Sequence, residues 1–94
     1  MAVLRLPPVL THAQAQACRA ELAQAMAASP DRVLLLDASD LQHFDSSALA
    51  VLLALQRAAL GRGCRVQVRE LPAQARQLAH VYGIESGLGL SSSH

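Results

Sequence analysis

The apolar positions of this chain change their spacing repeatedly, and each change predicts a new element of secondary structure. Residues 4–6 alternate apolar and basic side chains like a short half-exposed strand, which the Pro-Pro pair that follows ends. After Thr11, a helix cap, residues 12–28 are rich in Ala and Gln and keep helical spacing up to Ser-Pro-Asp at 29–31. The run Val33–Asp37, with four consecutive apolar residues, predicts a buried strand.

The second half of the chain repeats this succession. Residues 48–60 follow helical spacing again, so Asp45 or Ser46 is the predicted N-cap of a Leu-rich helix, and Gly-Arg-Gly at 61–63 is its predicted end. Residues 66–68 alternate as a third strand. A last helix opens at Pro72 and closes at Gly83. Its predicted apolar stripe consists of Leu71, Ala75, Leu78 and Tyr82.

The order of strand, helix, strand, helix, strand and helix predicts an α/β fold with right-handed crossovers. We expect a small, mostly parallel or mixed sheet of three or four strands, packed with about three helices. Residues 87–90 leave two alternatives open, a short further strand or a frayed end. Residues 1–90 are predicted to form one domain, and the polar residues 91–94 a disordered tail.

Composition narrows the classes of partner. Hydrophobic residues make up 52% of the 94 residues but aromatic ones only 2%, so the chain has almost no platform for stacking bases or sugars. The net charge is +1, and no basic stripe matches a row of phosphates. The longest apolar run, residues 48–55, is far shorter than the roughly 20 residues of a spanning helix. We therefore expect no nucleic-acid binding and no direct membrane insertion.

The start of the chain has no secretory leader pattern, and its two cysteines are isolated from each other in sequence. These features favour a cytoplasmic location. His12, His43, His80 and His94 are dispersed without the spacing of a metal site. No Gly-rich loop opens a helix to bind a nucleotide phosphate. The sequence therefore predicts no metal and no cofactor.

The candidate chemistry lies in the triplet Asp45-Ser46-Ser47, where a loop meets the start of a helix. Free backbone N–H groups at a helix start favour added negative charge, so a phosphoryl group on Ser46 is chemically reasonable, although Asp45 beside it opposes that charge. The simpler alternative is that the triplet only caps the helix. A hydrolase with Ser46 as nucleophile and His43 as base is disfavoured because no Gly-x-Ser-x-Gly elbow is present. We expect no catalytic residue.

Four segments together resemble a known family, the sulphate transporter and anti-sigma factor antagonist (STAS) domain. They are the strand 33–37, the triplet 45–47 with its Leu-rich helix, the turn and strand 61–68, and Leu-Ala-His-Val-Tyr-Gly-Ile at 78–84. In the anti-sigma factor antagonists of this family a partner kinase phosphorylates the hydroxyl residue directly after the Asp. The resemblance therefore implies Ser46 as a phosphosite, with an anti-sigma factor and a serine kinase as partners.

The small size and the Leu-Ala-x-x-Tyr-Gly pattern at 78–83 look more like a second bacterial branch, the MlaB-type component of the Mla phospholipid transport system. This resemblance implies a non-enzymatic accessory subunit that docks on the ATPase of an ABC transporter and never touches the lipid. Its location would be cytoplasmic, peripheral to the inner membrane through the complex. The implied docking face consists of His43, Phe44, Asp45, Ser46, Ser47, Gln56 and Arg57, with Gln56 and Arg57 on the solvent side of the helix.

Two departures from the family pattern matter. Ala48 stands where the family usually has Gly, so close approach of a partner backbone is less favoured. Only about ten residues precede Thr11, so the first edge strand is expected to be missing or reduced. A neighbouring strand edge would then be open to pair with a second copy, which predicts a possible homodimer.

Overall fold

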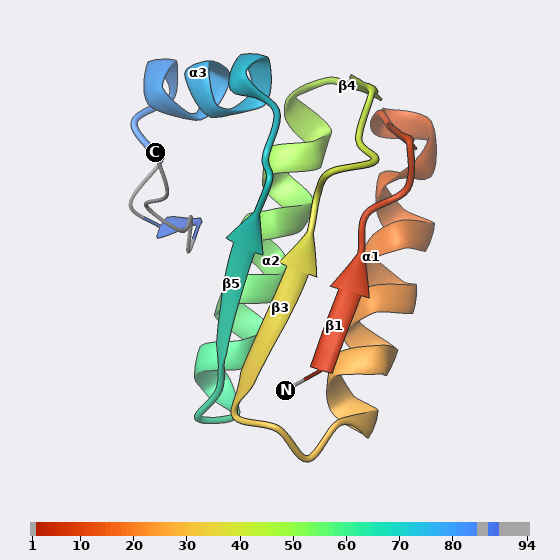
Figure 1. Cartoon of the computed structure of the whole chain (residues 1–94), viewed down its shortest axis with the longest axis vertical. Coiled ribbons are helices and arrows are strands. Elements are labelled where there is room, and N and C mark those ends of the chain that lie inside the picture. The colour runs from red at the N-terminus through yellow and green to blue at the C-terminus, as the bar shows by residue number, and fades with distance from the viewer. Residues whose placement is uncertain (1, 85–86, 89–94) are drawn as a thin grey trace.

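Figure 1 shows the computed structural model of the chain, which describes residues 2–84 and 87–88. Strands and helices alternate as the sequence predicts, with a parallel sheet and helical crossovers. In chain order the elements are β1 (Ala2–Arg5), β2 (Val9–Leu10), α1 (His12–Ala28), β3 (Val33–Asp37), β4 (His43–Phe44), α2 (Ser46–Gly61), β5 (Arg65–Arg69) and α3 (Ala73–Val81). The predicted α/β class is confirmed.

The main sheet has three parallel strands in the order β1-β3-β5. Leu36 of β3 is in register with Leu4 of β1 and with Val68 of β5. The edge strand β1 is therefore present, but with four residues it is short. It corresponds to the strand predicted around residues 4–6.

A second ladder joins β2 to β4, and neither of these strands was predicted from sequence. Val9 is paired with His43 and Leu10 with Phe44, in parallel. The carbonyl of Pro8 extends the ladder by accepting hydrogen bonds from the N–H groups of Gln42 and His43, at 2.8 and 2.9 Å. Two-residue strands carry no detectable alternation, so the sequence pattern held no signal for this ladder.

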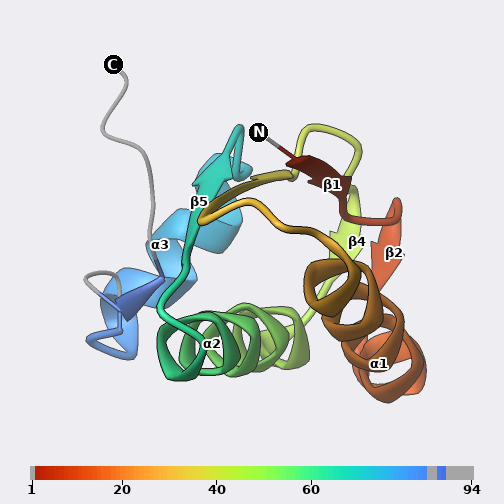
Figure 2. The ribbon, with the colours of Figure 1, turned by 90° about the horizontal axis from the view of Figure 1, so that it is seen from below.

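The helices of the described residues cover one face of the main sheet, so this part of the chain forms two layers (Figure 2). Leu34 and Leu36 point toward α1 and α2 and are buried, whereas Val33 and Leu35 on the other face are half-buried. The prediction of a buried strand is thus confirmed for the face toward the helices. An apolar run alone does not distinguish one covered face from two.

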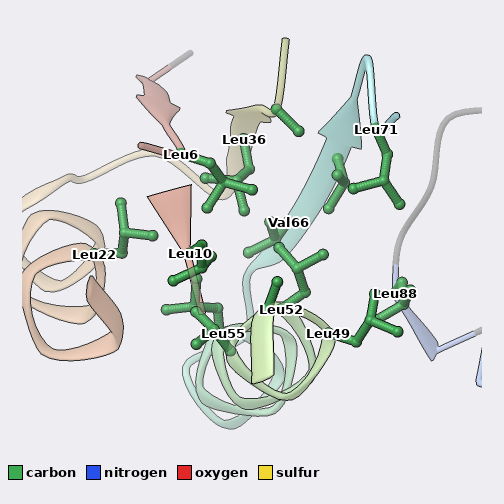
Figure 3. Packing of buried hydrophobic residues seen from close by; sticks show 14 of the residues in the cluster. Leu6, Leu10, Leu22, Leu36, Leu49, Leu52, Leu55, Val66, Leu71 and Leu88 are labelled. Carbon is green, nitrogen blue, oxygen red and sulfur yellow. The ribbon is translucent and has the colours of Figure 1, made fainter. Parts of the chain in front are cut away.

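The core lies between the sheet and the helices (Figure 3). α2 contributes more buried residues than any other element, whereas α1 buries only Leu22 and Met26. The core is aliphatic, as the composition predicts. Figure 3 labels Leu6, Leu10, Leu22, Leu36, Leu49, Leu52, Leu55, Val66, Leu71 and Leu88.

The C-terminal part differs from expectation at two points. Tyr82 was predicted to complete the apolar stripe of α3, but the helix ends at Val81 and the Tyr82 side chain is 57% exposed. Gly83 follows with φ 68°, a conformation that turns the chain away from the helix axis. Gly87 and Leu88 are not a strand, although Leu88 is buried. Residues 89–90 and the predicted tail at 91–94 lie outside the described residues.

Candidate functional site

The N-termini of α1 and α2 meet at one carboxylate, that of Asp45. Its Oδ1 accepts a hydrogen bond from the backbone N–H of Ser47 at 2.8 Å. Its Oδ2 accepts one from the backbone N–H of His12 at 3.1 Å. Asp45 is the N-cap of α2, one of the two predicted alternatives, and it also binds the first residue of α1. A single side chain thus satisfies otherwise unpaired N–H groups at the starts of two helices.

The β2–β4 ladder explains how Asp45 reaches a residue 33 positions earlier. Leu10 and Phe44 are paired at the end of that ladder, and each chain turns into a helix immediately afterwards. The caps Thr11 and Asp45 therefore lie side by side. Thr11 completes its own cap locally, because its N–H donates to Gln14 Oε1 at 3.0 Å. The loop is held by backbone geometry before any partner binds.

The two N–H donors stabilise the ionised form of Asp45. The hydrogen bond from Ser47 contributes most, and that from His12 next, and together they lower the pKa of Asp45 below its ordinary value of 3.8. The side chain is therefore a carboxylate at neutral pH. Two helix dipoles point their positive ends at it, which acts in the same direction.

Ser46 and Ser47 have different surroundings although they are adjacent. Ser46 is the first residue of α2 and is exposed. Within the described part of the chain its hydroxyl has no hydrogen-bond partner. Ser47 is half-buried and lines a groove between the helices. Of the pair, Ser46 is the residue whose side chain is open to solvent.

His43 and Phe44 precede this pair on β4. The His43 side chain is exposed, whereas Phe44 is half-buried and packs against the core. Ala48, in the position where the family usually has Gly, is also buried in the core. Its methyl group therefore faces the interior and not an approaching partner.

A groove of about 520 Å³ runs between α1 and α2 from this loop. Its lining is mostly small side chains with a polar margin: His12, Ala13, Ala15, Gln16, Arg19, Ser47, Ala50, Val51 and Ala54. No role for Arg19 or for the start of α1 was predicted from sequence. The available signal was topological, since helices that follow parallel strands begin at the same edge of the sheet.

Gln56 is not on the solvent side, contrary to the prediction. Its side-chain amide makes two hydrogen bonds with the backbone of Val66, donating to the carbonyl at 2.9 Å and accepting from the N–H at 3.0 Å. It pairs with the edge strand β5 as another strand would. Arg57, the next residue, is exposed as predicted. The Gln56 side chain is therefore bound within the fold, whereas the Arg57 side chain is open to solvent.

No helix among residues 2–84 and 87–88 is both long and apolar enough to cross a membrane. In the same described part, no three His, Cys, Asp or Glu side chains are grouped as metal ligands would be.

Comparison with known proteins agrees with the fold. A family model described as Mlab, STAS domain, matches residues 1–90. No curated protein sequence matches the chain. Among solved structures, the chain is similar to the anti-sigma factor antagonist SpoIIAA in its unphosphorylated form, with a TM-score of 0.74 and 19% identity over 97% of this chain and 79% of that one. At that identity the likeness shows a shared fold.

Proposed function

The chain belongs to the Mlab STAS domain family, and on that basis we propose that it is a non-enzymatic accessory subunit of an Mla-type phospholipid ABC transporter. In this role it docks on the cytoplasmic ATPase subunit. It then resides in the cytoplasm, held at the inner membrane through the complex. The lipid is handled by other subunits.

The observation that carries this proposal is the exposed Ser46 beside a preformed loop and groove. Asp45 fixes the loop by binding the starts of both helices. The groove next to it is lined by small side chains, so a partner segment can approach the helix backbones closely. Preformed surfaces bind with little ordering cost.

The candidate docking face then extends from the Ser46 loop along the outer side of α2. It includes exposed His43 and Arg57 and the groove margin at Arg19. Gln56 contributes indirectly, because it joins α2 to β5. Phe44 likewise supports the loop from below by packing against the core.

The test is binding to a purified Mla-type ATPase subunit from the same organism, measured by titration calorimetry. Ala50→Arg fills the groove with a long charged side chain and is expected to weaken binding at least about tenfold. Ala17→Arg is the matched control, because Ala17 is an exposed alanine of α1 outside the groove. Equal binding by both variants, or no binding by the wild-type protein, counts against the proposal.

A second function has one specific observation in its favour. The fold is similar to that of an anti-sigma factor antagonist solved in its unphosphorylated form, and Ser46 is exposed at a helix start. In this alternative Ser46 is phosphorylated, and the added charge controls binding to an anti-sigma factor. Intact-mass and phosphopeptide analysis after incubation with the cognate serine kinase tests it. Absence of phosphate at Ser46 rejects it.

Two substitutions separate the two functions in a binding assay. Ser46→Ala removes the hydroxyl, and Ser46→Asp replaces it with a negative charge. If Ser46 only donates a hydrogen bond to a partner, both variants bind more weakly. If Ser46 is a phosphoswitch, Ser46→Ala behaves as the unmodified protein and Ser46→Asp moves toward the modified one.

A further inference from the structure

Among residues 2–84 and 87–88, no helix covers the face of the main sheet opposite α1 and α2. Figure 2 shows α1 and α2 on one side of β1, β3 and β5, with no described helix on the other. All strand pairs in this sheet are parallel. Parallel sheets in proteins almost always have both faces covered. The outer sheet face, defined here by Val3, Arg5, Val33, Leu35, Asp37, Arg65, Gln67 and Arg69, therefore requires explanation.

The centre of the outer sheet face is apolar. Val3 of β1 is 58% exposed, and Val33 and Leu35 of β3 are half-buried. Val3, Leu35 and Gln67 form one row across the three strands, because Leu35 is in register with both others. Val3 and Leu35 also line a depression of about 320 Å³ that reaches toward Ser39. The depression is large enough to receive an apolar side chain from outside.

Basic side chains flank this apolar centre along the strands. Arg5 lies on β1, and Arg65 and Arg69 lie on β5, on either side of β3. The only carboxylate of the outer sheet face is Asp37, in register with Arg5 and Arg69, and one of its oxygens accepts the N–H of Ser39 at 2.9 Å.

Two further carboxylates lie beyond the strands, at one end of the face. Asp40 is 3.9 Å from Arg5, and Glu70 follows Arg69 and lines the depression. Arg32, at the opposite end, precedes Val33 and is exposed. Arg5 and Arg69 share this loop end with the three carboxylates. Arg65 and Arg32 lie at the opposite end, and the outer sheet face itself carries three arginines against one aspartate.

The size of the face selects among occupants. Three strands about 4.8 Å apart and five residues long span roughly 15 by 17 Å. A stable protein–protein interface needs about 800 Å² from each partner, so a face of this size supports neither a stable dimer of two stacked copies nor tight binding of a partner, but only a weak contact with a short segment. One α-helix, with a diameter of about 10 Å, covers the same area with roughly 11 residues.

We propose that the outer sheet face binds a single acidic amphipathic helix of a partner protein. The apolar stripe of that helix lies along Val33 and Leu35, and one of its apolar side chains enters the depression beside Val3. Its Glu or Asp residues on the two flanks pair with Arg5 on one side and with Arg65 and Arg69 on the other. This site is independent of the docking face at Ser46, because it lies on the opposite side of the sheet.

The probe is a synthetic 14-residue helical peptide with Leu at i, i+3 and i+4 spacing between flanking Glu residues. Its matched control has Lys at every Glu position. Titration of the isotope-labelled full chain, followed by NMR, is expected to shift the backbone amides of Val3, Leu35 and Gln67 with the acidic peptide only. Shifts confined to α1 and α2, equal shifts with the Lys peptide, or no shifts overturn the proposal.

Variants test which residues carry the binding. The double variant Arg65→Glu with Arg69→Glu is expected to lose these shifts, whereas Arg19→Glu with Arg57→Glu, the same charge change on the helices, keeps them. Val3→Glu, at an exposed side chain that the fold does not need, is expected to lose them too. Retention of the shifts in both sheet variants overturns the proposal.

Two other occupants are outcomes of the same study. The first is a lipid surface. If the wild-type chain cosediments with phosphatidylglycerol vesicles and the Arg65→Glu, Arg69→Glu variant does not, the face binds lipid and the helix proposal is overturned. The second is another copy of this chain. If analytical ultracentrifugation shows a concentration-dependent dimer that Val3→Glu abolishes, the face binds a second copy and the helix proposal is likewise overturned. A monomer without vesicle binding, together with the peptide shifts, supports the proposal.

Discussion

The carboxylate of Asp45 bonds to the backbone N–H of His12 at 3.1 Å, and so joins the start of α1 to the loop that opens α2. The same carboxylate holds Ser47 N–H at 2.8 Å. The loop that presents Ser46 is thereby tied to two helices. This relationship turns a sequence triplet into a rigid surface, and its strength depends on the charge of one side chain.

The first prediction concerns pH. Because hydrogen bonds from Ser47 and His12 lower the pKa of Asp45 in the folded state, ionised Asp45 stabilises the fold fully above its ordinary value of 3.8, and this stabilisation is lost as the pH falls through the lowered value. We expect Asp45→Asn to be less stable than the wild type at neutral pH. The difference should shrink on acidification below 3.8. Urea unfolding at a series of pH values measures it.

Asp40→Asn is the control for this experiment, because Asp40 is exposed and its nearest partner, Arg5, is 3.9 Å away. It should have little effect on unfolding at neutral pH. Asp45→Asn and Asp40→Asn with the same stability at neutral pH would contradict the double-cap interpretation.

The second prediction concerns Gln56 and the edge of β5. Gln56→Leu keeps the size of the side chain but removes both hydrogen bonds to Val66, leaving backbone groups of a buried residue unpaired. We expect a loss of about 1–3 kcal/mol in the free energy of unfolding. Hydrogen exchange at the Val66 amide should also accelerate. Gln56→Glu keeps the acceptor for the Val66 N–H and should retain more of its protection.

Arg57→Leu is the matched control, since Arg57 is the adjacent exposed residue on the same helix. It is expected to change stability by no more than about 0.5 kcal/mol. If Gln56→Leu changed the free energy of unfolding by as little as Arg57→Leu, the two hydrogen bonds between Gln56 and Val66 would not stabilise the fold. An effect of Gln56→Leu on partner binding without any change in stability would return Gln56 to the docking face.

The sequence predicted the regular elements well because their periods are long enough to detect. The helix predicted at residues 12–28 and the strand at residues 33–37 match α1 and β3 at both ends. The start of α2 was also predicted from sequence, since a hydroxyl and a carboxylate before a Leu-rich run mark a helix start. Their role in binding stays a prediction.

The errors share a physical cause. Periodicity reports which residues are apolar, but not which surface covers them. Tyr82 kept the helical spacing of α3, yet the helix stops one residue earlier and leaves the side chain exposed. Gln56 looked like a solvent residue because its partner, the backbone of Val66, lies ten positions away in sequence. The contact of Asp45 with His12 depends in the same way on tertiary structure.

The third prediction concerns the backbone at Glu70, which has φ 59°. A side chain with a Cβ costs about 1–2 kcal/mol in this left-handed conformation, and a β-branched one is the least compatible. We expect Glu70→Gly to be more stable than Glu70→Val by about 1–2 kcal/mol in thermal unfolding. At Arg69, in the extended strand β5, the order should reverse, with Arg69→Val more stable than Arg69→Gly. The same order at both positions would contradict the left-handed assignment.

The fourth prediction compares two neighbours on β3 that face opposite sides of the sheet. Leu36 points into the core and is 1% exposed, so Leu36→Ala should remove about 2–5 kcal/mol from the free energy of unfolding. Leu35 is half-buried on the outer sheet face, and Leu35→Ala should remove about 1 kcal/mol. Chemical denaturation of both variants measures the difference. Equal losses would mean that the outer sheet face is covered within the isolated chain, because only a covered face makes its leucine as important as the one in the core.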